Sequence, residues 1–342
     1  MSVKSGAWGL LLLLSLTGCA LTGSSLPVTD CTALNDAGFN PAPGQGIFFS
    51  CATPSNGVPQ EVARYQLRLP LVLKPSPVSH LIGAGDIAVC DNPGSELTAQ
   101  LLDRLSGDVF TAGDNSNEQG TPEQFAFCFD PSWGRHVDRI HPAPGNHDYK
   151  TDYAAGYFGY FGPAAGPSLQ GWYSYELNGW HILSLNSNCE RIGGCGPGSP
   201  QYEWLLNELA AHPEGCTLAY WHHPLFTSGE HGPSVDVAPL WDVLYAVGAE
   251  VVINGHDHHY ERFAPQSPAG VLDEAYGVRQ FIVGTGGALL RELPGDRMAN
   301  SQAAVIGYHG VLRLGLYVDG YSWQFITAPD GLVLDEGRAE CH

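Results

Sequence analysis

The chain has 342 residues, a hydrophobic share of 44% and a formal net charge of −20. Only 15 residues are Lys or Arg and no basic run occurs, so the basic surface of a nucleic-acid-binding protein is excluded and no nucleic-acid partner is expected. The hydrophobic share is ample for the core of one large domain or two small ones.

The first 18 residues carry the pattern of an export signal. Lys4 gives a basic start, and the apolar run at residues 8–16 is too short to span a bilayer. The run leads into Leu16-Thr17-Gly18-Cys19, which resembles a bacterial lipoprotein processing box. We therefore expect residues 1–18 to be a lipoprotein signal peptide and Cys19 to be lipidated and held at a membrane. Ordinary cleavage without lipidation stays open as an alternative.

The cysteine content agrees with export. Of nine cysteines, eight remain when Cys19 is set aside, and an even number in an exported chain predicts disulfides. Eight cysteines allow too many pairings for the connectivity to be deduced. Only Cys189 and Cys195 are predicted to pair, because the Gly-rich loop between them is short. We expect an exported protein that is either a membrane-anchored lipoprotein or located at the cell surface or outside the cell.

Residues 19–76 are rich in Ser, Thr, Pro and Gly, and only residues 65–73 alternate as a strand would. We expect a tether and N-terminal segment here, followed by the main domain at residues 77–342. In that domain, strands are predicted at 79–84, 109–112, 216–221, 250–254, 279–285, 310–318 and 321–328, helices at 95–105, 122–129, 200–212 and 237–247, and a hairpin at 172–177 and 180–186. This pattern favours an α/β fold in which two packed sheets are flanked by helices.

Five predicted strands end in polar residues that can bind metal ions. These residues are Asp86, Asp114, Asn146 (followed by His147), His222, and the pair His256 and His258. Two carboxylates, a carboxamide and three imidazoles form a mixed oxygen and nitrogen set, which suits Mn, Fe or Zn. An Asp able to bridge two ions, with ligands on either side, indicates a two-metal hydrolase centre.

The order GD, GD, GNHD, HxP and GHxH resembles the calcineurin-like metallophosphoesterase superfamily. The longer stretches PAPGNHDY, YWHHPLF and NGHDHHYERF are similar to its purple-acid-phosphatase-like, secreted bacterial branch, and the resemblance covers about residues 79–321. It implies an αββα sandwich of two mixed β-sheets flanked by helices, with residues 77–342 as the catalytic domain. It also implies a centre of two divalent or trivalent ions, which could be Fe, Mn or Zn.

The resemblance assigns a role to each motif residue. It implies that Asp86 and His258 bind the first metal, that Asp114 bridges both, and that Asn146, His222 and His256 bind the second. The HxP spacing selects His222 over His223. His147 matches a general acid or oxyanion-stabilising histidine, and His231 matches a substrate-contacting one, although a solvated loop histidine stays open for His231.

Two positions depart from the family pattern. Many metallophosphoesterases carry His at the place of Ala88, and the purple-phosphatase branch carries Tyr at the place of Asn117. Asn117 or water would then complete the first metal's ligands. Because an amide is a poorer ligand than tyrosinate, we expect weaker binding of that ion and a colourless protein.

The resemblance implies an extracytoplasmic two-metal phosphoesterase that hydrolyses phosphate monoesters of small molecules by metal-activated hydroxide attack. The alternatives are a phosphodiesterase or nucleotide pyrophosphohydrolase, and a surface lipoprotein whose site has decayed. Asp148 and Asp257 are candidates for orienting imidazoles, with solvated side chains as the alternative. Glu261 and Arg262 are expected to pair as ions, and the Gly-rich residues 283–287 to form a strand-end turn near the site.

Overall fold

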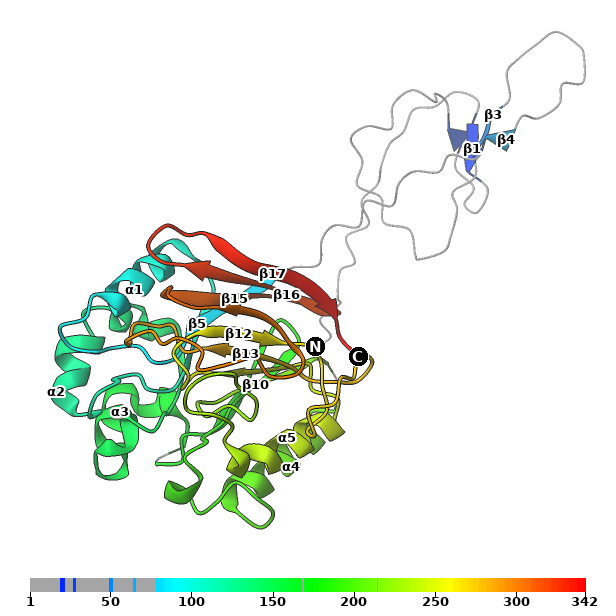
Figure 1. Ribbon diagram of the computed structural model, residues 1–342. Helices are drawn as coiled ribbons and strands as arrows, with labels where there is room; N and C mark the ends of the chain where they lie inside the picture. The colour runs from blue at the N-terminus through cyan, green and yellow to red at the C-terminus, as the bar shows by residue number, and fades with distance from the viewer. Residues whose placement is uncertain are drawn as a thin grey trace, which may run out of the picture. The chain divides into compact units, whose positions relative to one another are not determined.

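The computed structural model of the chain describes residues 78–167, 169–213 and 215–342, together with four short strands nearer the N-terminus (Figure 1). Those strands are β1 (Cys19–Leu21), β2 (Pro27–Val28), β3 (Phe49–Cys51) and β4 (Arg64–Tyr65), which pair antiparallel in the order β2-β1-β3-β4. The chain divides into two compact units, residues 1–74 and 75–342. The predicted signal peptide, the side chain of Cys19 and most of the predicted strand at 65–73 lie outside the described residues.

Two mixed β-sheets form the second unit. The six-stranded sheet has the order β17-β16-β15-β5-β6-β7 and the seven-stranded sheet the order β14-β12-β13-β11-β10-β9-β8. In the six-stranded sheet β5, β6 and β7 pair parallel, with β7 at one edge, and antiparallel pairing adds β15, β16 and β17 on the other side. In the seven-stranded sheet β9, β10, β11 and β13 pair parallel, and antiparallel pairing adds β8 at one edge and β12 and β14 at the other. The predicted α/β sandwich of two mixed sheets is confirmed.

The strand bounds follow in chain order. In the six-stranded sheet they are β5 (Ser79–Ala84), β6 (Asp108–Ala112), β7 (Ile140–Ala143), β15 (Gly310–Tyr317), β16 (Gly320–Thr327) and β17 (Val333–Glu340). In the seven-stranded sheet they are β8 (Tyr173–Leu177), β9 (Trp180–Ser184), β10 (Thr217–Tyr220), β11 (Val251–Asn254), β12 (Tyr260–Phe263), β13 (Arg279–Val283) and β14 (Ser301–Val305).

Alternating side chains of the strands fill two apolar layers, because successive residues of a strand point to opposite faces. Along β10, Leu218 and Tyr220 belong to the core between the sheets, whereas Ala219 belongs to the layer under the helices. Aromatic pairs join the sheets across the core. The ring centroids of Phe110 and Tyr220 lie 5.6 Å apart, and those of Tyr260 and Phe325 lie 4.1 Å apart.

Helices cover the outer faces (Figure 1). The helices α4 (Pro200–Ala211) and α5 (Ala238–Ala246) contact each other and bury apolar side chains against the seven-stranded sheet. The helix α1 (Gly94–Arg104) packs beside β15 of the other sheet. The helix α4 begins with Pro at its first position, where a missing N–H costs no hydrogen bond.

Several elements differ from the sequence-based expectations. The predicted helix at 122–129 is a single α-turn, α2 (Pro122–Gln124), followed by a π-helical turn at Phe125–Phe129, and α3 (Ala155–Phe161) was not predicted. The strands β14 and β17 were not predicted either. Their residues are half-buried or exposed in the described part of the chain, so they lack the apolar alternation that marks a strand.

Three disulfides link cysteines within residues 78–342. The predicted pair Cys189–Cys195 is confirmed, and Cys90–Cys128 and Cys216–Cys341 also form. The side chains of Cys31 and Cys51 lie outside the described residues.

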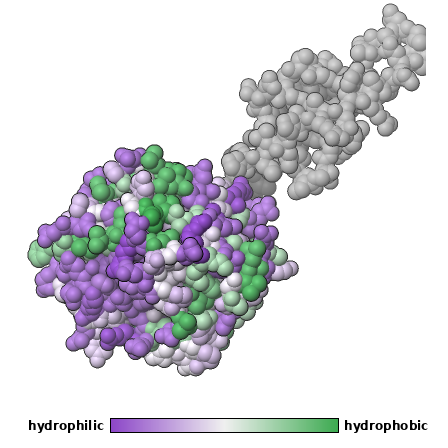
Figure 2. All heavy atoms as spheres, viewed as in Figure 1, coloured by the Kyte–Doolittle hydropathy of each residue, from purple (hydrophilic) through white to green (hydrophobic). Residues whose placement is uncertain are grey.

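Figure 2 shows a mostly hydrophilic face in which apolar residues gather in separate small groups. Among the described residues, none of the helices has the length and apolar character needed to cross a bilayer.

Candidate metal centre

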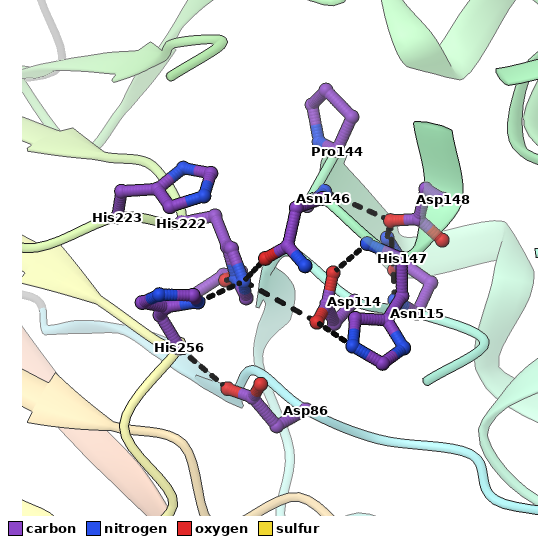
Figure 3. A network of polar contacts seen from close by, with 12 residues as sticks. Asp86, Asp114, Asn115, Pro144, Asn146, His147, Asp148, His222, His223 and His256 are labelled. Carbon is purple, nitrogen blue, oxygen red and sulfur yellow. Dashed lines mark hydrogen bonds and ion pairs between the residues drawn. The ribbon is translucent and has the colours of Figure 1, made fainter. Parts of the chain in front are cut away.

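The polar strand ends predicted from the sequence meet at one edge of the sandwich. Asp86 follows β5, Asp114 follows β6, Asn146 follows β7, His222 follows β10 and His256 follows β11, and their side chains face one another in Figure 3. Because the strands that carry them run parallel within each sheet, their carboxyl ends lie at a common edge, where α/β folds bind ligands.

The turns that deliver three of these side chains have unusual backbone geometry. Asp86, Asp114 and His256 have φ of 58°, 50° and 72°, a left-handed conformation that costs energy for residues other than Gly. Each follows a glycine, and a Cβ at Gly255 would lie 2.6 Å from the carbonyl oxygen of Ala112. The Gly-Asp and Gly-His pairs are therefore required by close packing of neighbouring turns.

One half of the centre surrounds Nε2 of His222. Its Nδ1–H donates to the carbonyl oxygen of Ala112 (2.9 Å), which turns Nε2 toward the cavity. That nitrogen lies 3.0 Å from Oδ1 of Asn146, 3.1 Å from Nδ1 of His256 and 3.3 Å from Oδ2 of Asp114. Oxygen and nitrogen acceptors therefore converge on one small volume, which is the arrangement that a cation stabilises.

The other half pairs Asp86 with His258. Oδ2 of Asp86 accepts the backbone N–H of His256 (2.7 Å), while the buried Oδ1 accepts no hydrogen bond among the described residues. Nδ1–H of His258 donates to the carbonyl oxygen of Leu289 (2.7 Å), and its Nε2 lies 3.2 Å from that Oδ1. An orphaned carboxylate oxygen facing an imidazole lone pair also fits a bound cation.

Asp114 lies between the two halves. One oxygen of each of Asp86 and Asp114 and one nitrogen of His222 all lie within 4.8 Å of one another. Oδ1 of Asp114 accepts the backbone N–H of His147 at 2.7 Å. The donor set therefore fits a pair of metal ions that share Asp114, with hard oxygen and borderline nitrogen ligands.

Charge and burial act strongly on these groups. Burial alone would lower the pKa of His222, but the carboxylates of Asp114 and Asp86 raise it to about 9. Burial would raise the pKa of Asp114, but the imidazoles of His222 and His147 hold it well below its usual range. Burial, together with His222 and His223, lowers the pKa of His256 far below its usual value. Without a metal, a proton on His222 therefore balances the carboxylates.

His147 lies at the mouth of the centre. Its Nδ1–H donates to the carbonyl oxygen of Glu118 (3.0 Å), and its Nε2 lies 3.9 Å from Oδ2 of Asp114. Nζ of Lys150 lies 3.0 and 3.3 Å from the two ring nitrogens. Lys150 is the last of only three lysines in the sequence, so this contact stands out in a chain with few basic residues.

A cavity of about 240 Å³ opens over the centre. Its lining includes His231, whose ring stacks on that of His256 with centroids 4.4 Å apart. Asn117 also lines it, with its amide nitrogen buried and without a hydrogen-bond partner among the described residues. The structure thus brings together all the residues assigned from the sequence: Asp86, Asp114, Asn117, Asn146, His147, His222, His231, His256 and His258.

Asp148 and Asp257 are fully buried, and neither accepts a hydrogen bond from an imidazole in the described part of the chain. Asp148 accepts hydrogen bonds from Gly145 N (2.9 Å) and from Nδ2 of Asn115 (3.0 Å), and it thereby ties the loops after β6 and β7 together. Asp257 accepts from Oγ1 of Thr227 (2.5 Å) and from His231 N (3.0 Å). Both carboxylates fix the backbone that carries the histidines.

The expected ion pair between Glu261 and Arg262 is wrong. Adjacent residues of a strand point to opposite faces, so the two side chains cannot meet. Arg262 pairs instead with Asp335 (2.7 Å), and Glu261 accepts from Oγ of Ser228 (2.6 Å) and Ser301 (2.6 Å). The Gly-rich residues 283–287 begin at the end of β13 and lie beside the site, as expected. A Cβ at Gly284 would lie 2.8 Å from Oδ2 of Asp86.

Two further side chains lie at the site: His223, which was weighed from the sequence and passed over in favour of His222, and Arg291, which was missed. His223 accepts from or donates to Oγ of Ser187 (2.8 Å), and its ring lies 4.6 Å from that of His256. Arg291 lines the cavity from a loop that carries no recognisable motif. A search for Lys or Arg next to the motifs would have found Lys150, which follows GNHDY directly, but it would not have found Arg291.

A family model described as calcineurin-like phosphoesterase matches residues 80–260, more than half of the chain. The chain belongs to the calcineurin-like phosphoesterase family. The matched residues begin at β5 and end at β12, so they include every strand end of the centre described above.

Curated relatives of this calcineurin-like phosphoesterase match over short stretches. Probable purple acid phosphatase 20 of Arabidopsis thaliana is 33% identical over 108 residues, which cover 29% of this chain and 24% of that protein. An uncharacterized protein of Mycobacterium tuberculosis is 25% identical over 191 residues, 46% of this chain and 35% of that protein. The matches thus span about a quarter to a third of these relatives.

Solved structures with the same fold include a purple acid phosphatase from yellow lupin (Lupinus luteus), with a TM-score of 0.62 and 20% identity over 78% of this chain and 54% of that one. GAP50, described as the anchor in the inner membrane complex of Plasmodium, has a TM-score of 0.61 and 13% identity over 78% of this chain and 89% of that one. At these identities the likeness establishes the fold alone.

Proposed function

We propose that this chain is an extracytoplasmic phosphoesterase that hydrolyses phosphate monoesters at a centre of two metal ions. The observation that carries the proposal is the convergence of Asn146, His256 and Asp114 on Nε2 of His222 at 3.0 to 3.3 Å, beside the orphaned Oδ1 of Asp86. A buried set of acceptors is stabilised only by a proton or a cation. Fe, Mn and Zn suit this donor set.

Each ligand has a place in the proposal. Asp86 and His258 would hold the first ion, with Asn117 or water completing its ligands, Asp114 would be shared by both ions, and Asn146, His222 and His256 would hold the second. A pair of metal ions, when bound, supplies Lewis acidity toward the phosphoryl oxygens and toward a water nucleophile. The backbone of Ala112 and Leu289 orients the imidazoles of His222 and His258, so that Nε2 of each faces the centre.

His147 and His231 are the proposed catalytic side chains. Both line the cavity, and they belong to segments far apart in the sequence. Nε2 of His147, with Nδ1–H held by Glu118, can accept or deliver a proton at a leaving-group oxygen. His231, fixed through its backbone by Asp257, can donate a hydrogen bond to a phosphoryl oxygen.

The choice of monoesters and of an extracytoplasmic location has separate support. Several curated relatives are named purple acid phosphatases, which favours monoesters. Disulfides persist in oxidising compartments, and three of them within residues 78–342 support export. A membrane anchor through Cys19 remains part of the proposal, as the sequence predicts.

The test is metal content measured together with hydrolysis of 4-nitrophenyl phosphate and bis(4-nitrophenyl) phosphate. We expect about two metal ions per chain and faster hydrolysis of the monoester. Asp114→Asn should lose metal and at least about a thousandfold in kcat, because it removes the shared charge. Asp91→Asn is the matched control, since Asp91 is exposed and also has a positive φ.

The results separate three functions. Preference for the diester would identify a phosphodiesterase. A metal-free protein that stays inactive with added Mn, Zn or Fe would indicate a decayed site. A non-catalytic role would be compatible with the fold, because GAP50, which has the same fold, is described as an anchor.

A further inference from the structure

Arg291 is the one Lys or Arg among the described residues that line the cavity over the metal centre. Its backbone N–H donates to the carbonyl oxygen of His258 (3.1 Å), and Nδ1–H of His258 donates to the carbonyl oxygen of Leu289 (2.7 Å). The segment 289–291 is therefore fastened to a proposed metal ligand at both ends. The position of the Arg291 backbone relative to the centre is thereby fixed.

The guanidinium group of Arg291 pairs with one carboxylate and keeps N–H donors for another anion. Nη1 of Arg291 lies 2.7 Å from Oε2 of Glu230, and the two side chains are 35% and 61% exposed. An ion pair exposed to this extent contributes little, so an anionic ligand can compete with Glu230 for the guanidinium. The five N–H donors of an Arg also allow a second oxyanion to bind while one nitrogen stays with Glu230.

Glu230 places the guanidinium beside the proposed catalytic His231. Glu230 is the residue before His231, and the backbone N–H of His231 donates to Oδ1 of the buried Asp257 (3.0 Å). Arg291 and His231 also line the same cavity of about 240 Å³. Arg291 is therefore close enough to His231 to contact the same ligand.

We propose that Arg291 forms an anion subsite next to the metal centre, which binds a second negatively charged group of the substrate, a phosphate or a carboxylate, beside the reacting phosphoryl group. The inference rests on the proposed phosphoesterase function and deepens it by naming the substrate class: phosphate esters and anhydrides that carry a second anionic group. In a chain with a net charge of −20, a cation at this wall is the feature that would select such substrates.

The kinetic test compares inorganic pyrophosphate, which has a second anionic group, with 4-nitrophenyl phosphate, which has none. Arg291→Ala should raise the KM for pyrophosphate by about tenfold or more, since a charge-assisted hydrogen bond is lost, and change the KM for 4-nitrophenyl phosphate less than about twofold. Glu230→Gln should lower the KM for pyrophosphate by freeing the guanidinium. Arg297→Ala, an exposed arginine of the same loop, is the matched control and should leave both values unchanged.

An equal effect of Arg291→Ala on both substrates, or no effect on either, would overturn the subsite. Calorimetric titration of the metal-loaded protein with phosphate and with pyrophosphate separates this result from failure of the proposed function. If the wild type hydrolyses neither substrate, the proposed function fails, but tighter binding of pyrophosphate that disappears in Arg291→Ala still supports the subsite. Equal binding of the two ions, or a preference that persists in Arg291→Ala, overturns it.

Discussion

Nε2 of His222 and Nδ1 of His256 lie 3.1 Å apart at the edge of the sandwich, facing each other across the space between two sheet turns. Two imidazole nitrogens at this distance share one proton or one cation, because two lone pairs repel. Burial lowers the pKa of His222, but Asp114 and Asp86 raise it to about 9, so we expect a proton to take this place when no metal does.

This relationship predicts how the stability of the metal-free protein depends on pH. The folded-state pKa of His222 lies above its unfolded value of about 6.5, so its stabilising contribution is complete below pH 6.5 and is lost as pH rises toward 9. We expect the chelator-treated protein to lose up to about 3 kcal/mol of unfolding free energy over this range. The metal-loaded protein should lose much less, because a cation replaces the proton.

The measurement is urea unfolding at pH 6.5 to 9.5, with and without a chelator. His222→Gln is the matched variant, and in its metal-free form the slope between these pH values should flatten. Parallel curves for the chelated and metal-loaded wild type would contradict the prediction.

A second prediction concerns Asp148, which joins the loops after β6 and β7. Asp148→Ala leaves the buried backbone N–H of Gly145 without its acceptor, and the side-chain amide of Asn115 keeps only the carbonyl oxygen of Ala143. We expect a loss of about 2 to 4 kcal/mol of unfolding free energy and weaker metal binding, since Asp114 and Asn146 lie on these loops. Urea unfolding and metal titration measure both, and Asp152→Ala, at an exposed position, should change neither. Unchanged metal affinity in Asp148→Ala would show that the two loops keep their positions without this link.

A third prediction follows from Asn117, whose side chain lines the cavity where the family resemblance leads one to expect a tyrosine. The iron-loaded wild type should be colourless at visible wavelengths. Asn117→Tyr should acquire a visible absorption band and bind iron more tightly, because a phenolate replaces an amide as ligand. The iron-free variant is the control for the spectrum, and a purple wild type would refute the assignment.

Much of the centre could be predicted from the sequence, because its information is local. A glycine followed by Asp or His after a short apolar strand specifies a tight turn at a strand end, as the left-handed φ of Asp86, Asp114 and His256 confirms. The sequence does not reveal which of Leu218, Ala219 and Tyr220 face the core between the sheets and which face the helices, because buried parallel strands are apolar on both faces.

What could not be predicted depends on contacts between distant segments. The partners of Cys90 and Cys216 lie 38 and 125 residues away, and no local pattern identifies them. The true partner of Arg262 is Asp335 on β17, a strand that was itself not predicted. Arg291 reaches the cavity only because its loop is fastened to His258.

A fourth prediction concerns Thr227, which connects Asp257 to the loop of His231. Oγ1 of Thr227 donates to Oδ2 of Asp257 (2.5 Å) and accepts from the backbone N–H of Gly229 (2.9 Å). Thr227→Val keeps the size but removes both bonds, so we expect a loss of about 2 kcal/mol of unfolding free energy and a lower kcat/KM. Thr227→Ser keeps the hydroxyl and should behave nearly as the wild type in unfolding and in hydrolysis of 4-nitrophenyl phosphate. Equal losses in the two variants would point to the methyl group instead.

The disulfide between Cys216 and Cys341 closes a covalent ring around residues 216–341. The ring contains His222, His231, His256 and His258, whereas Asp86, Asp114, Asn146 and His147 lie on the chain before it. All of these ligands lie before the exposed stretch 294–297, so a protease that cuts once there would leave them on one polypeptide, and the disulfide would keep the residues after the cut attached to it. Only reduction of the bond would let the fragment after the cut depart, so a nicked enzyme in an oxidising environment would stay whole.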